Sequence, residues 1–236
     1  MPSRLADLVA LSFFALYLAG ASASNTSVGQ AIWFPDKPAP AAYEWHYAPC
    51  KGCAAVEPQR DWLRMQHLAG LAKVHFVVAP DEQWGDAYSY PPDALVLSPA
   101  ALNLPRCQLD FVIGHELVHL AMRDFDEDAH TAAVLSGFSP TWTHNGKRAL
   151  SLLDGNIVLA LKMSSDWQAQ ERRADWVGAL LSAEGGGCTL EDGALPYMQS
   201  QTGYGGGIAA AHEPSMERAH FLMGFAEPAE RLASRW

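Results

Sequence analysis

The stretch that decides the fold is CQLDFVIGHELVHLAMR, residues 107–123. From Phe111 to Met122 its only ionisable residues are His115, Glu116 and His119, and nearly all others are apolar. The stretch predicts a helix that is apolar all round, and such a helix is buried in a protein core. A buried carboxylate is costly unless it is paired, hydrogen-bonded or held near a metal. The three polar residues are therefore the first candidates for a functional site.

The two histidines have the spacing of metal ligands. Positions four apart on a helix lie on one face, so His115 and His119 can hold one zinc ion through two imidazoles. Glu116 is rotated by about 100° around the helix axis, which places it to reach a water on the metal rather than the metal itself. The alternative is that both histidines are core residues bonded to backbone carbonyls, beside a partly exposed Glu116.

A later segment offers a third ligand. Glu171 and Asp175 are four residues apart in a predicted helix at 167–183, so both carboxylates share one face. Glu171 would complete a set of two histidines and one glutamate, and Asp175 would accept the ring N–H of a ligand histidine. The alternative is a solvated helix face, on which the carboxylates lie beside Arg172 and Arg173.

The composition is that of one globular domain. The chain has 236 residues, of which 49% are hydrophobic and 18% charged, so it can bury a large core. The formal net charge of −10 gives no electrostatic reason to bind nucleic acid, and we expect no such partner. The sequence does not indicate an oligomeric state.

The pattern of elements predicts an α+β fold that is rich in helices and has a small sheet. Helices are expected at 58–72, 107–123, about 147–163 and 167–183, with a last one from about Pro214. Strands are expected at 74–78 and 94–97. Prolines on both sides of the second strand indicate that it lies at a sheet edge.

The N-terminus has the features of a signal peptide. Arg4 precedes an apolar run from Leu8 to Ala19, and Ala21-Ser22-Ala23 fits the cleavage pattern. The run is short for a membrane span, which needs about 20 residues, although an uncleaved anchor is the alternative. We expect an exported protein, periplasmic or extracellular, without stable membrane insertion after cleavage. The expected parts are a signal peptide at 1–23, an irregular proline-rich arm at 24–57, and the main domain at 58–236.

Four cysteines in an exported chain predict two disulfides. Cys50 and Cys53 have redox spacing but follow a proline-rich segment, so a local structural bond is the better interpretation. Cys107 and Cys188 would form the second bond. If Glu171 joins the two histidines at one zinc, the two helices lie side by side. Should they run antiparallel, the chain beyond Glu171 returns to the start of the first helix, and the glycines at 185–187 bring Cys188 near Cys107.

These motifs resemble the gluzincin peptidases related to HtpX and the CAAX prenyl protease, of which the soluble periplasmic members are most similar. The similarity covers about 58–223 and is carried by the HExxH stretch, His115 to His119, and by Glu171-x-x-Ala-Asp175. It implies a zincin-like metallopeptidase domain with zinc bound by the two histidines and Glu171. Asp86 stands where the family often has asparagine.

The resemblance implies two further parts of the site. The family uses a strand to align the substrate, and Val96 and Leu97 occupy that place in this chain. The family also carries a late His-Pro motif followed by arginine, to which His212, Pro214 and Arg218 correspond, with the proline one place later. The histidine of that motif approaches the zinc, where it can occupy the open position or support the oxyanion. The alternative is that His212 is a surface residue.

We therefore expect a zinc-dependent endopeptidase that acts on polypeptides through a metal-activated water, with Glu116 taking the proton of the water and returning it to the leaving amine. Exported or misfolded envelope proteins are the substrates that the family suggests. One alternative is a zinc-binding chaperone or scaffold for envelope assembly, which the intact Glu116 does not favour. Another is a redox protein that uses Cys50 and Cys53.

Overall fold

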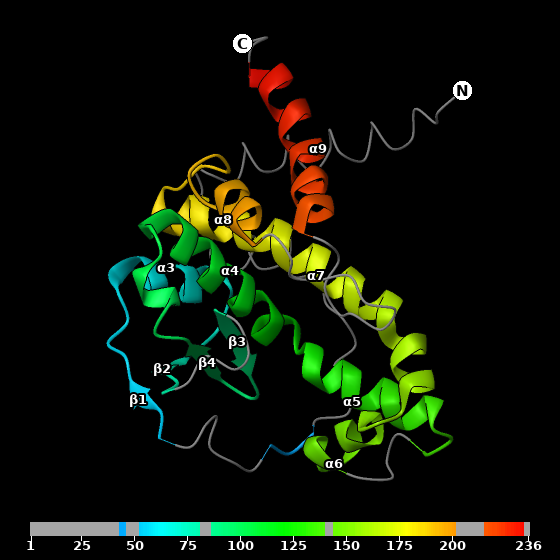
Figure 1. The fold of residues 1–236 in the computed structure, drawn as a ribbon. Helices are drawn as coiled ribbons and strands as arrows, with labels where there is room; N and C mark the ends of the chain where they lie inside the picture. Colours follow the sequence, from blue (N-terminus) through cyan, green and yellow to red (C-terminus); the bar gives the residue numbers. More distant parts are fainter. Residues whose placement is uncertain (1–42, 46–51, 81–85, 140–143, 202–214, 234–236) are drawn as a thin grey trace, which may run out of the picture. The chain divides into compact units, whose positions relative to one another are not determined.

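The HELVH stretch lies in α4 (Arg106–Met122), the central helix of the computed structural model (Figure 1). Every residue from Leu109 to Leu120 is buried, which confirms the predicted buried helix. The structure describes residues 43–45, 52–80, 86–139, 144–201 and 215–233. These residues all fall within one compact unit. The predicted signal peptide, 1–23, lies outside them, as does most of the predicted arm.

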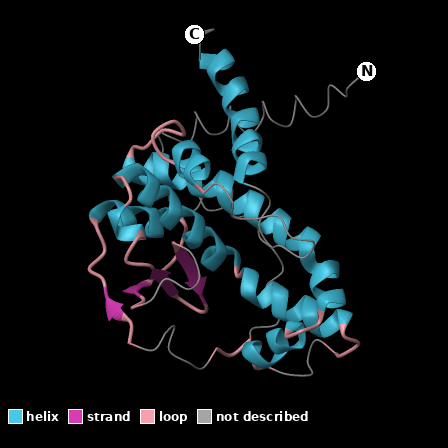
Figure 2. Cartoon of the chain, viewed as in Figure 1, coloured by secondary structure: helices cyan, strands magenta, loops and turns pink. Residues whose placement is uncertain are grey.

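A mixed four-stranded sheet contacts α4 through its strands β3 and β4 (Figures 1 and 2). The strand order is β1 (Ala54–Ala55), β2 (His75–Val78), β4 (Ala94–Leu97), β3 (Ala87–Tyr90). β4 pairs parallel to β2 and antiparallel to β3, and β1 pairs antiparallel to β2. The expected α+β class, with many helices and a small sheet, is confirmed.

The prediction that residues 94–97 lie at a sheet edge is wrong. β4 lies between β2 and β3, and its residues Leu95, Val96 and Leu97 are fully buried. The prolines that indicated an edge precede or follow the strand, so they remove no hydrogen bond from its ladder. Val96 and Leu97 therefore cannot align a substrate. Among the described residues β3 has only β4 beside it, so β3 is the edge strand next to α4.

α7 (Ile157–Gly186) runs antiparallel to α4. Near the start of α4, Cys107 is bonded to Cys188, just beyond the end of α7, with a Cα–Cα distance of 5.4 Å. This is the pairing that the sequence predicted. Further along, Gly114 lies against Gly178. Cys53 is also disulfide-bonded, and its predicted partner Cys50 lies outside the described residues.

The two helices touch backbone to backbone at this pair of glycines. A Cβ atom at Gly114 would lie 2.6 Å from the carbonyl oxygen of Gly178, and a Cβ atom at Gly178 would lie 2.6 Å from the nitrogen of His115. No real Cβ atom fits at such a distance. Only glycine at both positions allows α7 to approach the turn of α4 that carries His115.

The helices differ from the prediction in two places. Residues 157–186 form one helix rather than the end of one and most of another. Ser164 lies between the two expected helices, and its hydroxyl donates to the carbonyl of Leu161 within the single helix. α5 (Asp124–Leu135) was not predicted, and it follows α4 directly because Arg123 adopts a left-handed conformation with φ of 56°.

The remaining helices cover the two ends of this core. They are α3 (Arg60–Leu68), η1 (Ala101–Asn103), α6 (Gly146–Leu150), η2 (Ser151–Leu153), α8 (Ala194–Ser200) and α9 (Ser215–Ala233). α8 and α9 pack together on the N-terminal half of α4, around Phe111 and Val112. None of the described helices combines the length and the apolar character needed to cross a bilayer.

We predict that Gly178→Ala destabilises the protein by about 1–3 kcal/mol, because the new methyl group forces α7 away from α4. The free energy of unfolding is measured by chemical denaturation. Gly224→Ala is the matched control, because a Cβ atom at this helical glycine would have no described neighbour within 4 Å. The control should gain about 0.5–1 kcal/mol from helix propensity. Equal stability of both variants would contradict the close contact.

Candidate metal centre

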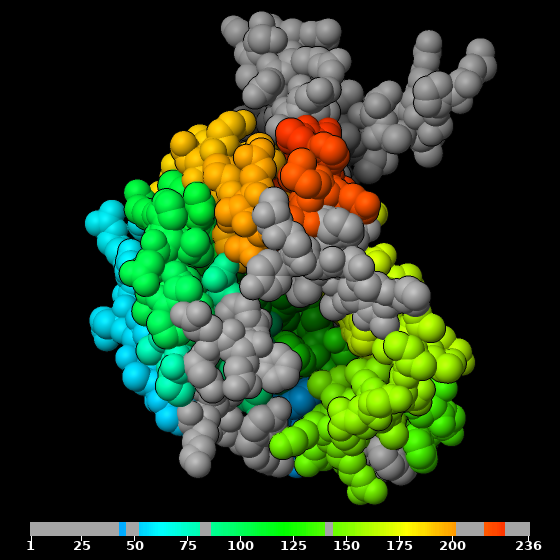
Figure 3. Space-filling model, in the orientation of Figure 1, coloured from blue at the N-terminus to red at the C-terminus, as the bar shows by residue number. Residues whose placement is uncertain are grey.

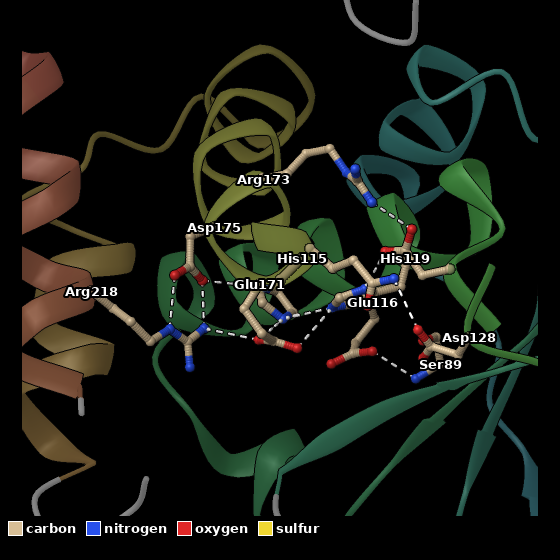
Figure 4. Close-up of polar contacts among 11 residues, drawn as sticks. Ser89, His115, Glu116, His119, Asp128, Glu171, Arg173, Asp175 and Arg218 are labelled. Carbon is tan, nitrogen blue, oxygen red and sulfur yellow. Dashed lines mark hydrogen bonds and ion pairs between the residues drawn. The ribbon is translucent and has the colours of Figure 1, made fainter. Parts of the chain in front are cut away.

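His115, His119 and Glu171 converge on one point between α4 and α7 (Figure 4). The Nε2 atoms of the two histidines are 3.1 Å apart. The carboxylate of Glu171 spans both, with Oε2 3.3 Å from Nε2 of His115 and Oε1 3.4 Å from Nε2 of His119. All three side chains are buried, and together they could hold a metal ion.

The spacing of these donor atoms fits a tetrahedral ion. Bonds of about 2.0–2.1 Å to a tetrahedral zinc separate its ligand atoms by about 3.3–3.4 Å. The three separations between the donors of this site, 3.1, 3.3 and 3.4 Å, are close to that value. Two imidazole nitrogens and a carboxylate oxygen facing one another in a buried site also need a positive charge between them.

Each ligand histidine is held by its own carboxylate. Asp175 Oδ1 lies 3.0 Å from Nδ1 of His115, as the sequence analysis expected of Asp175. Asp124 Oδ2 lies 2.8 Å from Nδ1 of His119, a contact that sequence reasoning missed. The hydrogen bond of His119 to Asp124 and the short contact of His115 with Asp175 favour a proton on Nδ1 of each ring, which leaves the lone pair of Nε2 for the metal.

Each of these carboxylates is in turn paired with an arginine. Arg218 Nε donates to Asp175 Oδ2 at 2.7 Å, and its terminal nitrogen pairs with Asp175 Oδ1. Arg173 pairs in the same way with Asp124 Oδ1 (Figure 4). A His–Asp–Arg chain therefore supports each ligand histidine. Arg218 follows the late motif in the sequence, whereas Arg173 gave no signal beyond its position beside Glu171.

The charges of the site set its titration in the metal-free protein. Burial lowers the pKa of His115, but the negative charge of Glu171 and the hydrogen bonding of the ring to the carboxylates of Asp175 and Glu171 outweigh burial and raise it to about 9. Burial raises the pKa of Asp175, but Arg218 and His115 outweigh that effect and lower it. The carboxylate of Asp175 is therefore ionised, and a metal ion that binds here competes with protons for the histidines.

Glu116 lies beside the three donors but is not one of them. Its Oε2 accepts a hydrogen bond of 2.6 Å from the backbone N–H of Ser89 in β3 (Figure 4). The edge strand thus holds this carboxylate in one orientation. In the space-filling view the surface is hollowed in this region, and green atoms, the colour of α4, are visible at the floor of the hollow (Figure 3).

α5 braces the turn of α7 that carries Glu171. Arg173, two residues after Glu171, pairs with Asp124, and Gln170, one residue before it, donates through Nε2 to Asp128 Oδ1 at 3.0 Å. Burial raises the pKa of Asp128 to about 7, against the hydrogen bond from Gln170, which lowers it.

Of the remaining candidates, His212 lies outside the described residues and stays a prediction.

We predict that Asp124→Asn weakens zinc binding about 10–100-fold. The two carboxylate oxygens of Asp124 contact His119 and Arg173, one each, whereas an amide has only one oxygen and cannot accept at both places. Competition against a chromophoric chelator measures the affinity. Asp166→Asn, at an exposed position of α7, is the control and should bind zinc as tightly as the wild type. An unchanged affinity in Asp124→Asn would show that His119 does not depend on this carboxylate.

We predict that the metal-free protein loses stability as pH rises from about 4 to about 7, since the pKa of Asp128 is raised on folding. The folded state holds a proton on Asp128 in this window and the unfolded state does not. Asp128→Asn should remove this part of the slope and be more stable above pH 7, by about 1–3 kcal/mol. Denaturation with a chelator present, at several pH values, measures both. The same slope in Asp128→Asn and in the exposed control Asp154→Asn would contradict the assignment.

Comparisons of the chain with models of known protein families, with curated proteins and with solved structures give no match. The resemblance to the gluzincin peptidases therefore stays a prediction. What the structure provides is a buried group of two histidines and one glutamate that could hold a metal ion, with a second glutamate held beside it.

Proposed function

We propose that this protein is a zinc-dependent endopeptidase that hydrolyses exported polypeptides. One observation carries the proposal: His115, His119 and Glu171 form a three-donor group, and Glu116 is held next to it without belonging to it. A site with three protein ligands leaves one position of a tetrahedral ion open, which is the arrangement of catalytic rather than structural zinc.

The donor set favours zinc over the harder cations. Calcium and magnesium prefer oxygen ligands, whereas two of the three donors here are imidazole nitrogens. Bound by these residues, zinc would supply a Lewis acid that polarises the scissile carbonyl and lowers the pKa of a water. A metal ion on Nε2 would displace the second proton of each imidazole, and the proton left on Nδ1 would face Asp124 in His119 and Asp175 in His115.

Glu116 is the proposed proton carrier. Because Oε2 accepts the N–H of Ser89, the other oxygen, Oε1, takes the proton of the attacking water. The same oxygen then delivers the proton to the nitrogen of the leaving amine. The hydrogen bond from β3 fixes the rotation of the carboxylate during both transfers, and this orientation is part of the proposed mechanism.

The outer edge of β3, beside which no described strand lies, is the proposed binding site for an extended polypeptide. The backbone carbonyl of Asp86 accepts from Ser98 N–H, so the main-chain groups of residue 86 point towards β4. Because this direction alternates along a strand, the main-chain groups of Tyr88 and Tyr90 also point towards β4. The main-chain groups of Ala87 and Ser89 point away from β4, and because Ser89 N–H donates to Glu116, a polypeptide would pair with Ala87 and with the carbonyl of Ser89. Main-chain hydrogen bonds at this edge give affinity with little sequence preference, which suits unfolded polypeptide substrates.

We predict that Glu116→Gln retains zinc and the fold but loses peptide hydrolysis by at least about 10²–10⁴-fold, because the amide cannot take the proton. Digestion of an unfolded protein such as casein, with metal content measured on the same samples, tests this. His115→Ala and Glu171→Ala are the paired variants, and they should lose metal as well as activity.

Two outcomes would contradict the proposal. Full activity of Glu116→Gln would remove Glu116 from the reaction. A wild-type protein that holds one zinc ion per chain and cleaves no polypeptide would instead favour the zinc-binding chaperone or scaffold.

A further inference from the structure

Asp86 connects the start of the edge strand to α8. The hydroxyl of Tyr197 donates to Asp86 Oδ2 at 3.0 Å, and Nε2 of Gln201 donates to the same oxygen at 3.0 Å. The backbone carbonyl of Asp86 accepts from Ser98 N–H at 2.8 Å, which continues the ladder between β3 and β4. The residue is thus fixed through its backbone to the sheet and through its side chain to α8.

Tyr197 is itself held against the helix that carries the metal ligands. Its ring packs on Phe111, with 5.7 Å between ring centroids, and Phe111 in turn contacts His115 at 6.2 Å. Burial, with the neighbouring carboxylate of Asp86, raises the pKa of Tyr197. The hydroxyl therefore stays protonated and remains a hydrogen-bond donor. Asp86 is bound to a side chain that cannot move independently of α4.

β3 begins at Ala87, directly after Asp86, and its third residue, Ser89, contacts Glu116. Ser89 N–H donates to Glu116 Oε2 at 2.6 Å, and β3 has only four residues and one described neighbouring strand. The ladder with β4 fixes β3 along one side, and the strand also packs against α4. The contacts of Asp86 with Tyr197 and Gln201 fix the start of the strand through a side chain.

We propose that Asp86, Tyr197 and Gln201 form a latch that positions β3 and, through Ser89 N–H, the carboxylate of Glu116. All three act on the site through β3, so they are positioning residues and not catalytic ones. The inference rests on the proposed function, because it assigns to the latch the alignment of the proton carrier and of the strand that binds the polypeptide. Both donors meet on one oxygen of Asp86, which can accept two hydrogen bonds.

Three variants separate the hydrogen bonds of the latch from its charge and from packing. Tyr197→Phe removes the hydroxyl and keeps the ring on Phe111. Asp86→Ala removes the acceptor altogether. Asp86→Asn keeps an acceptor oxygen and removes the charge. It is the conservative variant, and its exchange rates and kcat should be close to those of the wild type. Ser200→Ala is the matched control, because the hydroxyl of Ser200 donates within the same helix to the carbonyl of Tyr197 and lies away from Asp86.

The first readout is hydrogen exchange in the metal-free protein, which needs no activity. The backbone amides of residues 86–90 should exchange about tenfold faster in Tyr197→Phe and Asp86→Ala, which is the effect of losing roughly one hydrogen bond. The amides of residues 75–78, in β2, should exchange as in the wild type. The second readout is kinetic: kcat on an unfolded polypeptide should fall about tenfold or more in these two variants, with zinc affinity unchanged.

The outcomes distinguish the latch from the proposed function. Wild-type exchange at residues 86–90 in Tyr197→Phe would overturn the latch, whatever the activity. Faster exchange with an unchanged kcat would overturn its role in positioning Glu116. If the wild-type protein cleaves no polypeptide, the proposed function fails. The role of the latch in catalysis then fails with it, even where the exchange rates show that Asp86 holds β3. Faster exchange, lower kcat and recovery in Asp86→Asn would together support it.

Discussion

The contact between the backbones of α4 and α7 at Gly114 and Gly178 is the constraint on which the rest of the site depends. It brings the turn of α4 that carries His115 against α7, and the disulfide between Cys107 and Cys188 fixes the same pair of helices at one end. Because the helices run antiparallel, the chain two turns before Gly178 lies beside the turn of α4 that carries the second histidine. Glu171 occupies that place, so the three donors meet without any strained loop.

The second constraint is electrostatic. Four carboxylates gather here, those of Glu116, Asp124, Glu171 and Asp175, and two guanidinium groups, those of Arg173 and Arg218, pair with two of them. With neutral histidines, two negative charges remain uncompensated. A buried site in that state is costly, and a divalent cation balances it. The arginines pair most closely with the two aspartates, and Arg218 also lies 3.7 Å from Glu171 Oε2, so a metal ion would balance the charge that Glu171 and Glu116 retain.

Local periodicity explains what the sequence could predict. The spacing of His115 and His119, and of Glu171 and Asp175, depends only on the geometry of single helices, and the structure brings these four residues together. The Cys107–Cys188 bond was predictable because it follows from two helices meeting at one metal. Each of these inferences needed no knowledge of how distant strands pair.

The parts that could not be predicted depend on tertiary contacts. Asp124 points back to His119 because the chain reverses at Arg123, and the run of acidic residues after Arg123 gives no sign of which one does so. The prolines before and after β4 indicated an edge strand, whereas its pairing with β2 and β3 puts it inside the sheet. The hydrogen bond from Ser89 to Glu116 depends on that same pairing, so no local pattern of residues indicated it.

The measurement that tests the central claim most directly is a zinc titration of peptidase activity. Metal-free protein is given increasing amounts of zinc, and cleavage of an unfolded polypeptide is followed at each step. We expect activity to rise in proportion to the added zinc and to level off at about one equivalent per chain, as a single three-ligand catalytic site requires. Cleavage at the same rate without metal, or a fully loaded protein that cleaves nothing, would contradict the claim that this site is the catalytic centre of a zinc peptidase.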